Sequence, residues 1–164
     1  MTNDLVMDDT LTKVSTEAAS DLVKSFYVAL QSNRQSIATY YSATPTTILF
    51  NGNQVADGPA VQEIFVNQMP TAKYEVQSYD AQIINRAYPT PTADGGTKPT
   101  SEMGIKDMSL LVLVSGFVTY GDGPDLPQRA FSESFVMIPN PTASDRGKHR
   151  KDWLIQSHNF RLVV

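Results

Sequence analysis

The chain has 164 residues, a formal net charge of −4 and no cysteine. A chain of this length typically forms one domain, and its hydrophobic fraction of 41% is enough for a buried core. The negative charge excludes a general attraction to nucleic acids or anionic membranes, and the lack of cysteine excludes disulfides, thiolate metal sites and a cysteine nucleophile. No stretch has the length of a membrane span and the first residues lack the pattern of a signal peptide, so we expect an intracellular protein without membrane insertion.

The N-terminal part of the chain predicts a long amphipathic helix. Residues 1–14 are acidic, and we expect them to be a flexible N-terminus ahead of one domain over 15–164. Apolar residues at helical spacing then predict a helix from about Ser15 to Leu30, with Ser15 or Thr16 available as the N-cap. The apolar stripe consists of Ala18, Ala19, Leu22, Val23, Phe26, Tyr27 and Leu30.

Shorter elements follow this helix. Residues 34–41 predict a second, shorter helix. Residues 46–55 predict a small hairpin, because the Asn51-Gly52 pair tolerates positive φ at both central turn positions. A third helix is expected between the Gly58-Pro59 pair and Pro70, since proline is favoured in the first helical turn and disfavoured in the interior.

The second half of the chain predicts long strands. Residues 73–84 have an imperfect alternation around Tyr79 and Asp80, which suggests a bulge there. Residues 87–107 are rich in Pro, Gly and Thr with almost nothing to bury, so we expect a long, exposed and mobile insertion. Strands over 108–120, 128–138 and 152–163 should then form an antiparallel meander. Helices followed by long strands indicate the α+β class, with the helices on one face of the sheet.

The strand "SLLVLVSGFVTY" poses the main question of this sequence, because both of its faces are apolar. A strand with one face in water should alternate polar and apolar residues, so the second apolar row needs a cover. One row contains Leu110, Val112, Val114 and Val118, and the other contains Leu111, Leu113 and Phe117. The cover is either another protein or the insertion or a terminus folded back; we favour a partner protein, because the insertion is too polar to be a lid.

The two final strands have one large apolar row each and one flat row. Their expected inward residues are Phe131, Phe135 and Met137, then Leu154, Phe160 and Leu162. Their expected outward residues are Ser132, Ser134 and Val136, then Ile155, Ser157, Asn159, Arg161 and Val163. Arg161 on the flat row is either solvated or an interface anchor, and we favour the anchor, because arginine is enriched in interface cores.

Several segments then succeed one another in a specific order: a long helix, a short helix, "FNGNQVADG", a helix ending in "MPTAKYEV", and the strands "LVLVSGFVTYGD", "QRAFSESFVMIPN" and "WLIQSHNFRLVV". From about Ala18 onward this order resembles the nuclear transport factor 2-like family, a cone of three N-terminal helices packed on a curved, mainly antiparallel sheet. Within the family it is most similar to the small subunits of heterodimeric messenger-RNA export receptors. The insertion resembles that of the fungal type.

The resemblance implies a non-enzymatic protein without a cofactor that pairs, sheet to sheet, with the cone domain of a large receptor subunit. The heterodimer would carry messenger ribonucleoprotein, and in fungi pre-ribosomal subunits, past phenylalanine-glycine nucleoporins, between the nucleus, the nuclear pore and the cytoplasm. Arg161 and Asp80 match the positions that make charge contacts with the partner; Asp80 could instead have an intramolecular partner at the bulge. The expected partner-binding residues are Asp80, Leu111, Leu113, Phe117, Ser132, Ser134, Val136, Ser157, Asn159 and Arg161.

A basic run and one histidine leave alternatives open. The loop over 145–152 contains Arg146, Lys148, Arg150 and Lys151, which either are solvated or contact RNA phosphates. His158 is expected on the inward row, where we favour a buried, satisfied side chain over a catalytic one. No zinc spacing, phosphate loop or catalytic carboxylate pair is present. The competing functions are a cone-pocket isomerase or dehydratase using His158, and a homodimer that binds a small ligand.

Overall fold

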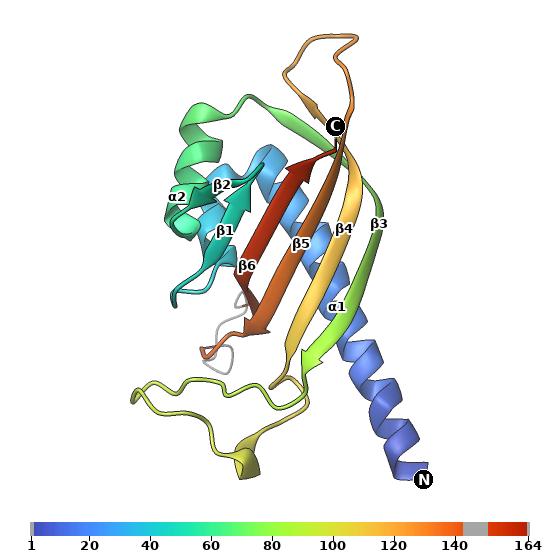
Figure 1. The fold of residues 1–164 in the computed structure, drawn as a ribbon, viewed down its shortest axis with the longest axis vertical. Coiled ribbons are helices and arrows are strands. Elements are labelled where there is room, and N and C mark those ends of the chain that lie inside the picture. The colour runs from blue at the N-terminus through green and yellow to red at the C-terminus, as the bar shows by residue number, and fades with distance from the viewer. Residues whose placement is uncertain (1, 143–150, 164) are drawn as a thin grey trace.

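A computed structural model describes residues 2–142 and 151–163. Figure 1 shows one six-stranded sheet, in the order β2-β1-β6-β5-β4-β3, with α1 and the other main helices behind it. The helical segments are α1 (Thr2–Ser32), η1 (Arg34–Tyr40), α2 (Gly58–Glu63), η2 (Ile64–Gln68) and η3 (Thr100–Glu102). The strands are β1 (Thr47–Phe50), β2 (Asn53–Val55), β3 (Ala72–Asn85), β4 (Ser109–Tyr120), β5 (Arg129–Pro139) and β6 (Trp153–Leu162). This arrangement confirms the expected α+β class.

The first helix is longer than the sequence analysis expects. Residues 2–14, expected to be flexible, continue α1 instead. The physical reason is that the apolar stripe extends toward the N-terminus: Leu11 is buried and Val14 packs against the core. An ion pair of 2.9 Å between Asp8 and Arg86 also connects this extension to the end of β3. Neither α1 nor any other described helix is long and apolar enough to cross a membrane.

The hairpin and the third helix form as the sequence predicts. Asn51 and Gly52 both have positive φ, of 50° and 83°, in the turn between β1 and β2. The carboxylate of Asp57 accepts a hydrogen bond of 2.9 Å from the Ala60 backbone N–H and so caps α2. The helix continues as the π-helical segment η2 and ends at Met69, directly before Pro70.

The Arg34 side chain joins α1 to the end of η2. Its guanidinium donates to the carbonyl oxygens of Phe65, Met69 and Pro70 at 2.7, 2.9 and 2.6 Å. Its Nε also donates to the Leu30 carbonyl at 2.8 Å. A planar donor group of this kind satisfies helix-end carbonyls that otherwise have no partner in the helix.

We therefore expect Arg34→Met to lower the free energy of unfolding by about 2 kcal/mol, because it leaves these carbonyls without their charged donor. Urea denaturation followed by circular dichroism measures the change. Arg86→Met is the matched control: its ion pair is exposed, so the expected loss is below about 1 kcal/mol. Equal losses for the two variants would contradict the assigned role of Arg34.

Strands β3 to β6 form the expected antiparallel meander, and β1 adds to β6 in parallel. The irregularities in β3 lie at Gln77 and Ile84 and not at Tyr79 and Asp80, where the sequence places a bulge. The bulge at Gln77 faces Gly116 of β4, and a Cβ on Gly116 would overlap the Glu75 carbonyl oxygen. The absence of a side chain therefore lets β3 cross β4 closely.

The start of β6 corrects the sequence analysis. The register between β5 and β6 shifts after Val136, so that Ser157 faces Val136 and Ile155 faces Met137. The intervening Gln156 is a bulge, which reverses the alternation ahead of it. Ile155 is consequently fully buried and Leu154 is only half-buried, the opposite of the expected placement.

Residues 87–107 form the expected excursion between β3 and β4, and most of them are exposed. The expectation that the segment buries almost nothing is wrong at Thr90 and Asp107. The Asp107 carboxylate accepts hydrogen bonds from the Thr90 hydroxyl at 2.9 Å, the Lys98 ammonium at 2.8 Å and the Gly104 N–H at 2.6 Å. These bonds tie the two ends of the excursion together.

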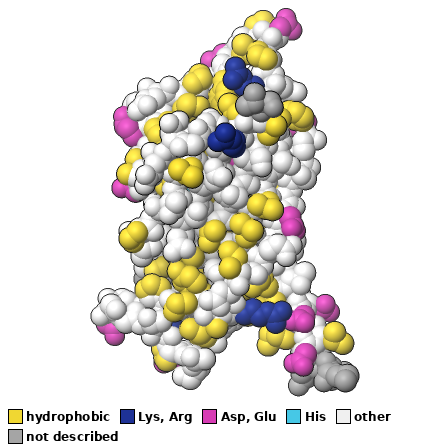
Figure 2. All heavy atoms as spheres, viewed as in Figure 1, with side chains coloured by type: hydrophobic (Ala, Val, Ile, Leu, Met, Phe, Trp, Pro, Cys, Tyr) yellow, Lys and Arg dark blue, Asp and Glu magenta, His cyan; other side chains and the backbone are white. Residues whose placement is uncertain are grey.

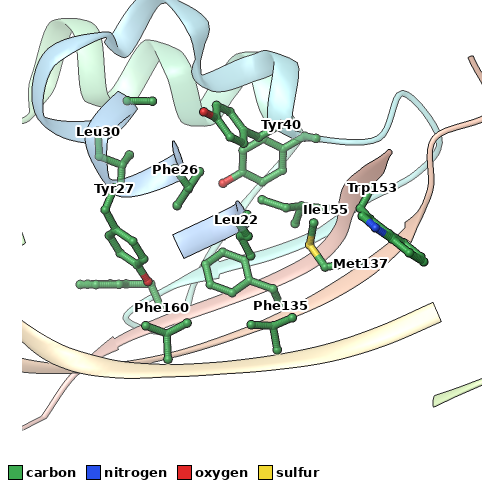
Figure 3. Packing of buried hydrophobic residues seen from close by; sticks show 14 of the residues in the cluster. Leu22, Phe26, Tyr27, Leu30, Tyr40, Phe135, Met137, Trp153, Ile155 and Phe160 are labelled. Atoms are coloured by element: carbon green, nitrogen blue, oxygen red, sulfur yellow. The ribbon is translucent and has the colours of Figure 1, made fainter. Parts of the chain in front are cut away.

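The hydrophobic core lies between α1 and the inner face of the sheet, as Figure 3 shows. Phe26 of α1 is at its centre, with its ring centroid 5.6 Å from that of Phe135 and 5.3 Å from that of Tyr40. Both contacts are edge-to-face, a favourable arrangement of aromatic rings. The expected inward rows of β4 and β5 are confirmed, because Leu110, Val112, Val114, Val118, Phe131, Phe135 and Met137 are all buried.

Candidate functional site: the open face of the sheet

The face of the sheet opposite α1, called the outer face below, is built from cross-strand rows. Residues directly opposite each other in neighbouring strands share a face. The registers of β3, β4, β5 and β6 give three rows: Ser78, Ser115, Ser132 and Arg161; Asp80, Leu113, Ser134 and Asn159; Gln82, Leu111, Val136 and Ser157. Phe117 of β4 extends the face beside them. The structure thus brings all ten predicted partner-binding residues onto one surface.

The outer face exposes large apolar side chains. Leu113 is 45% exposed and Phe117 is 37% exposed, although both lie on β4, which is paired with a strand on each side. Figure 2 shows this side of the molecule, where hydrophobic side chains lie across the middle and acidic side chains lie near the margins. In Figure 1 the insertion lies beyond the lower ends of the strands and does not cross them. Among the described residues, therefore, no segment covers Leu113 and Phe117.

Arg161 and Asp80 lie at opposite sides of the outer face. Their rows place them three strands apart, about 15 Å at the usual strand spacing. The Asp80 carboxylate accepts a hydrogen bond of 2.9 Å from Gln82, which is an intramolecular partner but not a cation. Within the described part of the chain, the exposed Arg161 guanidinium has no carboxylate partner. Arg161 also lines a shallow depression of about 620 Å³ together with Leu113, Ser132 and Asn159.

The predicted RNA-contacting loop is described only at its end. Arg146, Lys148 and Arg150 lie outside the described residues. The Lys151 ammonium lies 4.1 Å from the ring centroid of Tyr40 and donates a hydrogen bond of 3.0 Å to the Thr39 hydroxyl. Burial lowers the pKa of Lys151. Lys151 therefore packs against η1, and its contact with RNA stays a prediction.

A buried polar cluster lies on the inner face of the same strands. His158 and Glu133 side chains are only 3% and 2% exposed, and His158 Nε2 lies 2.7 Å from Glu133 Oε2. His158 Nδ1 lies 2.9 Å from the Tyr41 hydroxyl. His158 is thus buried with both ring nitrogens satisfied, as the sequence analysis favours.

Sequence reasoning missed Glu133. The alternation of β5 places it between Phe131 and Phe135 on the inward row, and that signal was present in "AFSESFV". Burial raises the pKa of Tyr41 well above its usual value, and the negative Glu133 carboxylate raises it further. The pKa of Tyr27 is also raised, first by burial and then by the Glu133 carboxylate. Both phenols are therefore uncharged; the Tyr41 hydroxyl is bonded to His158, whereas the buried Tyr27 hydroxyl has no hydrogen-bond partner among the described residues.

The polar cluster offers limited chemistry to a substrate. A general acid or base needs a free ring nitrogen within reach of the reacting atom, and Tyr41 and Glu133 occupy both nitrogens of His158. The described residues also contain no group of three or more His, Cys, Asp or Glu side chains placed to hold a metal ion. The outer face is therefore the better-supported candidate site.

Three helices, α1, η1 and the continuous α2–η2, lie on one face of an open six-stranded mixed sheet whose other face is bare in the described part of the chain. This arrangement defines a cone fold that serves both binding proteins and enzymes. The sequence model of the nuclear transport factor 2 (NTF2) domain matches residues 18–161, and the chain belongs to this family. A search of curated proteins by sequence found no match.

Solved structures of similar fold include a complex of the Mex67 NTF2-like domain with Mtr2. A chain of the Chaetomium thermophilum Mex67 NTF2-like domain complexed with Mtr2 has 22% identity and a TM-score of 0.75, over 91% of this chain and 98% of that one. A structure of Mtr2 has 20% identity and a TM-score of 0.72, over 91% and 99%. A provisionally named scytalone dehydratase from Novosphingobium aromaticivorans has 7% identity and a TM-score of 0.62, over 95% and 89%. At these identities the similarity establishes the fold alone.

Proposed function

We propose that this chain is the non-enzymatic small subunit of a heterodimeric messenger-RNA export receptor, and that its outer face pairs with the NTF2-like domain of the large subunit. The observation that carries the proposal is that the apolar side chains of Leu113 and Phe117 are exposed on β4, a strand paired on both sides. Large apolar groups on a fully paired strand are unfavourable in water and favourable in an interface core. The fold similarity to the complex of Mex67 with Mtr2 supports a partner of this kind.

Arg161 fits one side of such an interface. Its guanidinium is exposed beside Ser132 and Asn159, small side chains that allow a partner strand to approach. A carboxylate on the partner could form a bidentate pair with it, which a lysine would not reproduce. Asp80 would meet a cation of the partner about 15 Å away, so that the two charges set the orientation of the complex.

The cellular role follows from this assembly as part of the same proposal. The heterodimer would carry messenger ribonucleoprotein, and possible further cargo such as pre-ribosomal subunits, through the nuclear pore by contacting phenylalanine-glycine nucleoporins. It would shuttle between nucleus and cytoplasm. The basic loop over 145–152 would add phosphate contacts without base specificity.

The test is the mass of the native complex after affinity purification from the chain's own cells at low salt. We expect a one-to-one complex with a larger chain that has its own cone domain. Arg161→Asp should weaken that complex by at least tenfold, because it places like charges opposite each other. Lys24→Asp makes the same charge change on an exposed position of α1 and should have no effect. A symmetric homodimer that is indifferent to Arg161→Asp would contradict the proposal.

A further inference from the structure

A cavity of about 340 Å³ opens on the inner side of the sheet, between the β1–β2 hairpin, the end of η2 and α1. This is at the lower end of the usual size of small-molecule sites. Six aromatic side chains contribute to its walls: Phe26, Phe50, Phe65, Tyr74, Tyr120 and Phe160. The Phe50 ring stands edge-on to those of Phe65 and Phe160, with centroids 6.1 Å apart in both cases. The outer face and its partner lie on the other side of the sheet, so the proposed function makes no use of this cavity.

The polar part of the cavity lining contains Glu133 and His158. His158 has a protein partner at each ring nitrogen, Tyr41 and Glu133, and so has no free site for a ligand. The Glu133 carboxylate can accept several hydrogen bonds, and the bond from His158 engages one of its two oxygens. Glu133 therefore adds a carboxylate acceptor to the uncharged amide and hydroxyl oxygens of the lining.

The electrostatics of the cavity favour a positive ligand. Apart from His158, the lining contains no basic side chain, while it contains the buried Glu133 carboxylate. Burial, the neighbouring Tyr120 and then the Glu133 carboxylate raise the pKa of Tyr74, whereas Arg34, which lies outside the lining with its guanidinium 5.6 Å from the Phe65 ring centroid, lowers it. Faces of aromatic rings also attract cations, most strongly where water is excluded. An anion would be repelled by both the carboxylate and the negative faces of the rings.

We propose that this cavity binds a small organic cation, an amine with an aromatic or apolar body. The ammonium donates a hydrogen bond to the Glu133 carboxylate, and the body packs among the rings of Phe50, Phe65 and Phe160. The amide side chains of Asn53 and Gln68 lie in the lining as well and can hold the polar edge of a ligand. Such a site belongs to the chain itself and does not depend on any partner at the outer face.

Three probes with a phenyl ring on a two-carbon arm test the proposal with the full chain at neutral pH. These are phenethylamine, which is a cation, phenethyl alcohol, which is neutral, and phenylacetate, which is an anion. Two-dimensional NMR titration measures the dissociation constants and locates each probe. We expect phenethylamine to bind at least about tenfold more tightly than phenethyl alcohol, because a charge-assisted hydrogen bond is roughly twice as strong as a neutral one. Phenylacetate should not bind.

Variants assign the selectivity to Glu133. Glu133→Gln keeps the size of the side chain and removes the charge, and it should abolish the preference for phenethylamine over phenethyl alcohol. Glu75→Gln changes an exposed carboxylate of β3 and is the matched control, with no expected effect. The relative affinities of the three probes are measured on the unmodified chain. The proposal can therefore be tested even if Glu133→Gln fails to fold.

The outcomes separate clearly. Tighter binding of phenethylamine, with NMR shifts at residues around Phe50, Phe65 and His158, supports the site. Equal binding of the amine and the alcohol, tighter binding of phenylacetate, shifts elsewhere on the chain, or no binding of any probe at millimolar concentration would overturn it.

Discussion

Leu113→Lys is expected to bind the partner that co-purifies with the unmodified chain about 100-fold more weakly. Leu113 is nearly half exposed at the middle of the outer face, between Asp80 and Ser134. A charge buried in an interface without its partner costs about 3 kcal/mol or more, and about 2.8 kcal/mol corresponds to a 100-fold change in affinity. A lysine there would bury its ammonium or hold the two surfaces apart. Titration calorimetry with the purified partner measures the loss.

The same substitution should leave the isolated chain folded. The new lysine faces Asp80 across the strand pair, and opposite charges in that position stabilise a sheet modestly. We expect the melting temperature to stay within a few degrees and the solubility of the isolated chain to rise, since an exposed apolar side chain is removed. Val28→Lys, at an exposed apolar position of α1, is the control and should keep full affinity. Unchanged affinity of Leu113→Lys would show that the partner binds elsewhere.

Gly116→Ala is expected to lower the free energy of unfolding by about 3 kcal/mol, or the melting temperature by about 6–12 °C. The added methyl group would overlap the carbonyl oxygen of Glu75, and that oxygen belongs to the backbone of β3 and cannot rotate away. The bulge at Gln77 would have to shift, which disturbs the crossing of β3 over β4. Thermal unfolding followed by circular dichroism measures the change.

Gly123→Ala is the matched control for this prediction. A Cβ at Gly123 would meet only the flexible side chain of Leu126, at ordinary contact distances of 3.8 Å and more. Its expected effect is below about 0.5 kcal/mol. Similar stabilities of the two variants would mean that β3 does not pass as closely over Gly116 as the structure places it.

Much of the fold could be predicted from local patterns. The positive φ values of Asn51 and Gly52, the proline positions around α2 and the alternation along β4 each follow from the conformational limits of single residues and from the two-residue period of a strand. The same period identified both apolar rows of β4 and hence the outer face. These features depend on neighbours in sequence, so no knowledge of distant contacts was needed.

The expectations that the structure corrects share one physical cause. Each feature depends on contacts between segments that are distant in the sequence. The bulge at Gln156 shifts the register of β6 against β5, and it exchanged the expected positions of Leu154 and Ile155. The helical residues 2–14 depend on where Leu11 meets the core.

The sequence by itself determined that the chain has an amphipathic helical layer, a sheet with two apolar rows on one strand, and an arginine on the flat row of the last strand. These are periodic properties, and periodicity is a property of the chain alone. Tertiary structure decided that Glu133 and His158, 25 residues apart, share a buried hydrogen bond beside Tyr41, and that Asp80 and Arg161 face the same solvent at opposite sides of one surface. Strand register and bulges set both arrangements, because a shift of one residue would move every side chain to the other face.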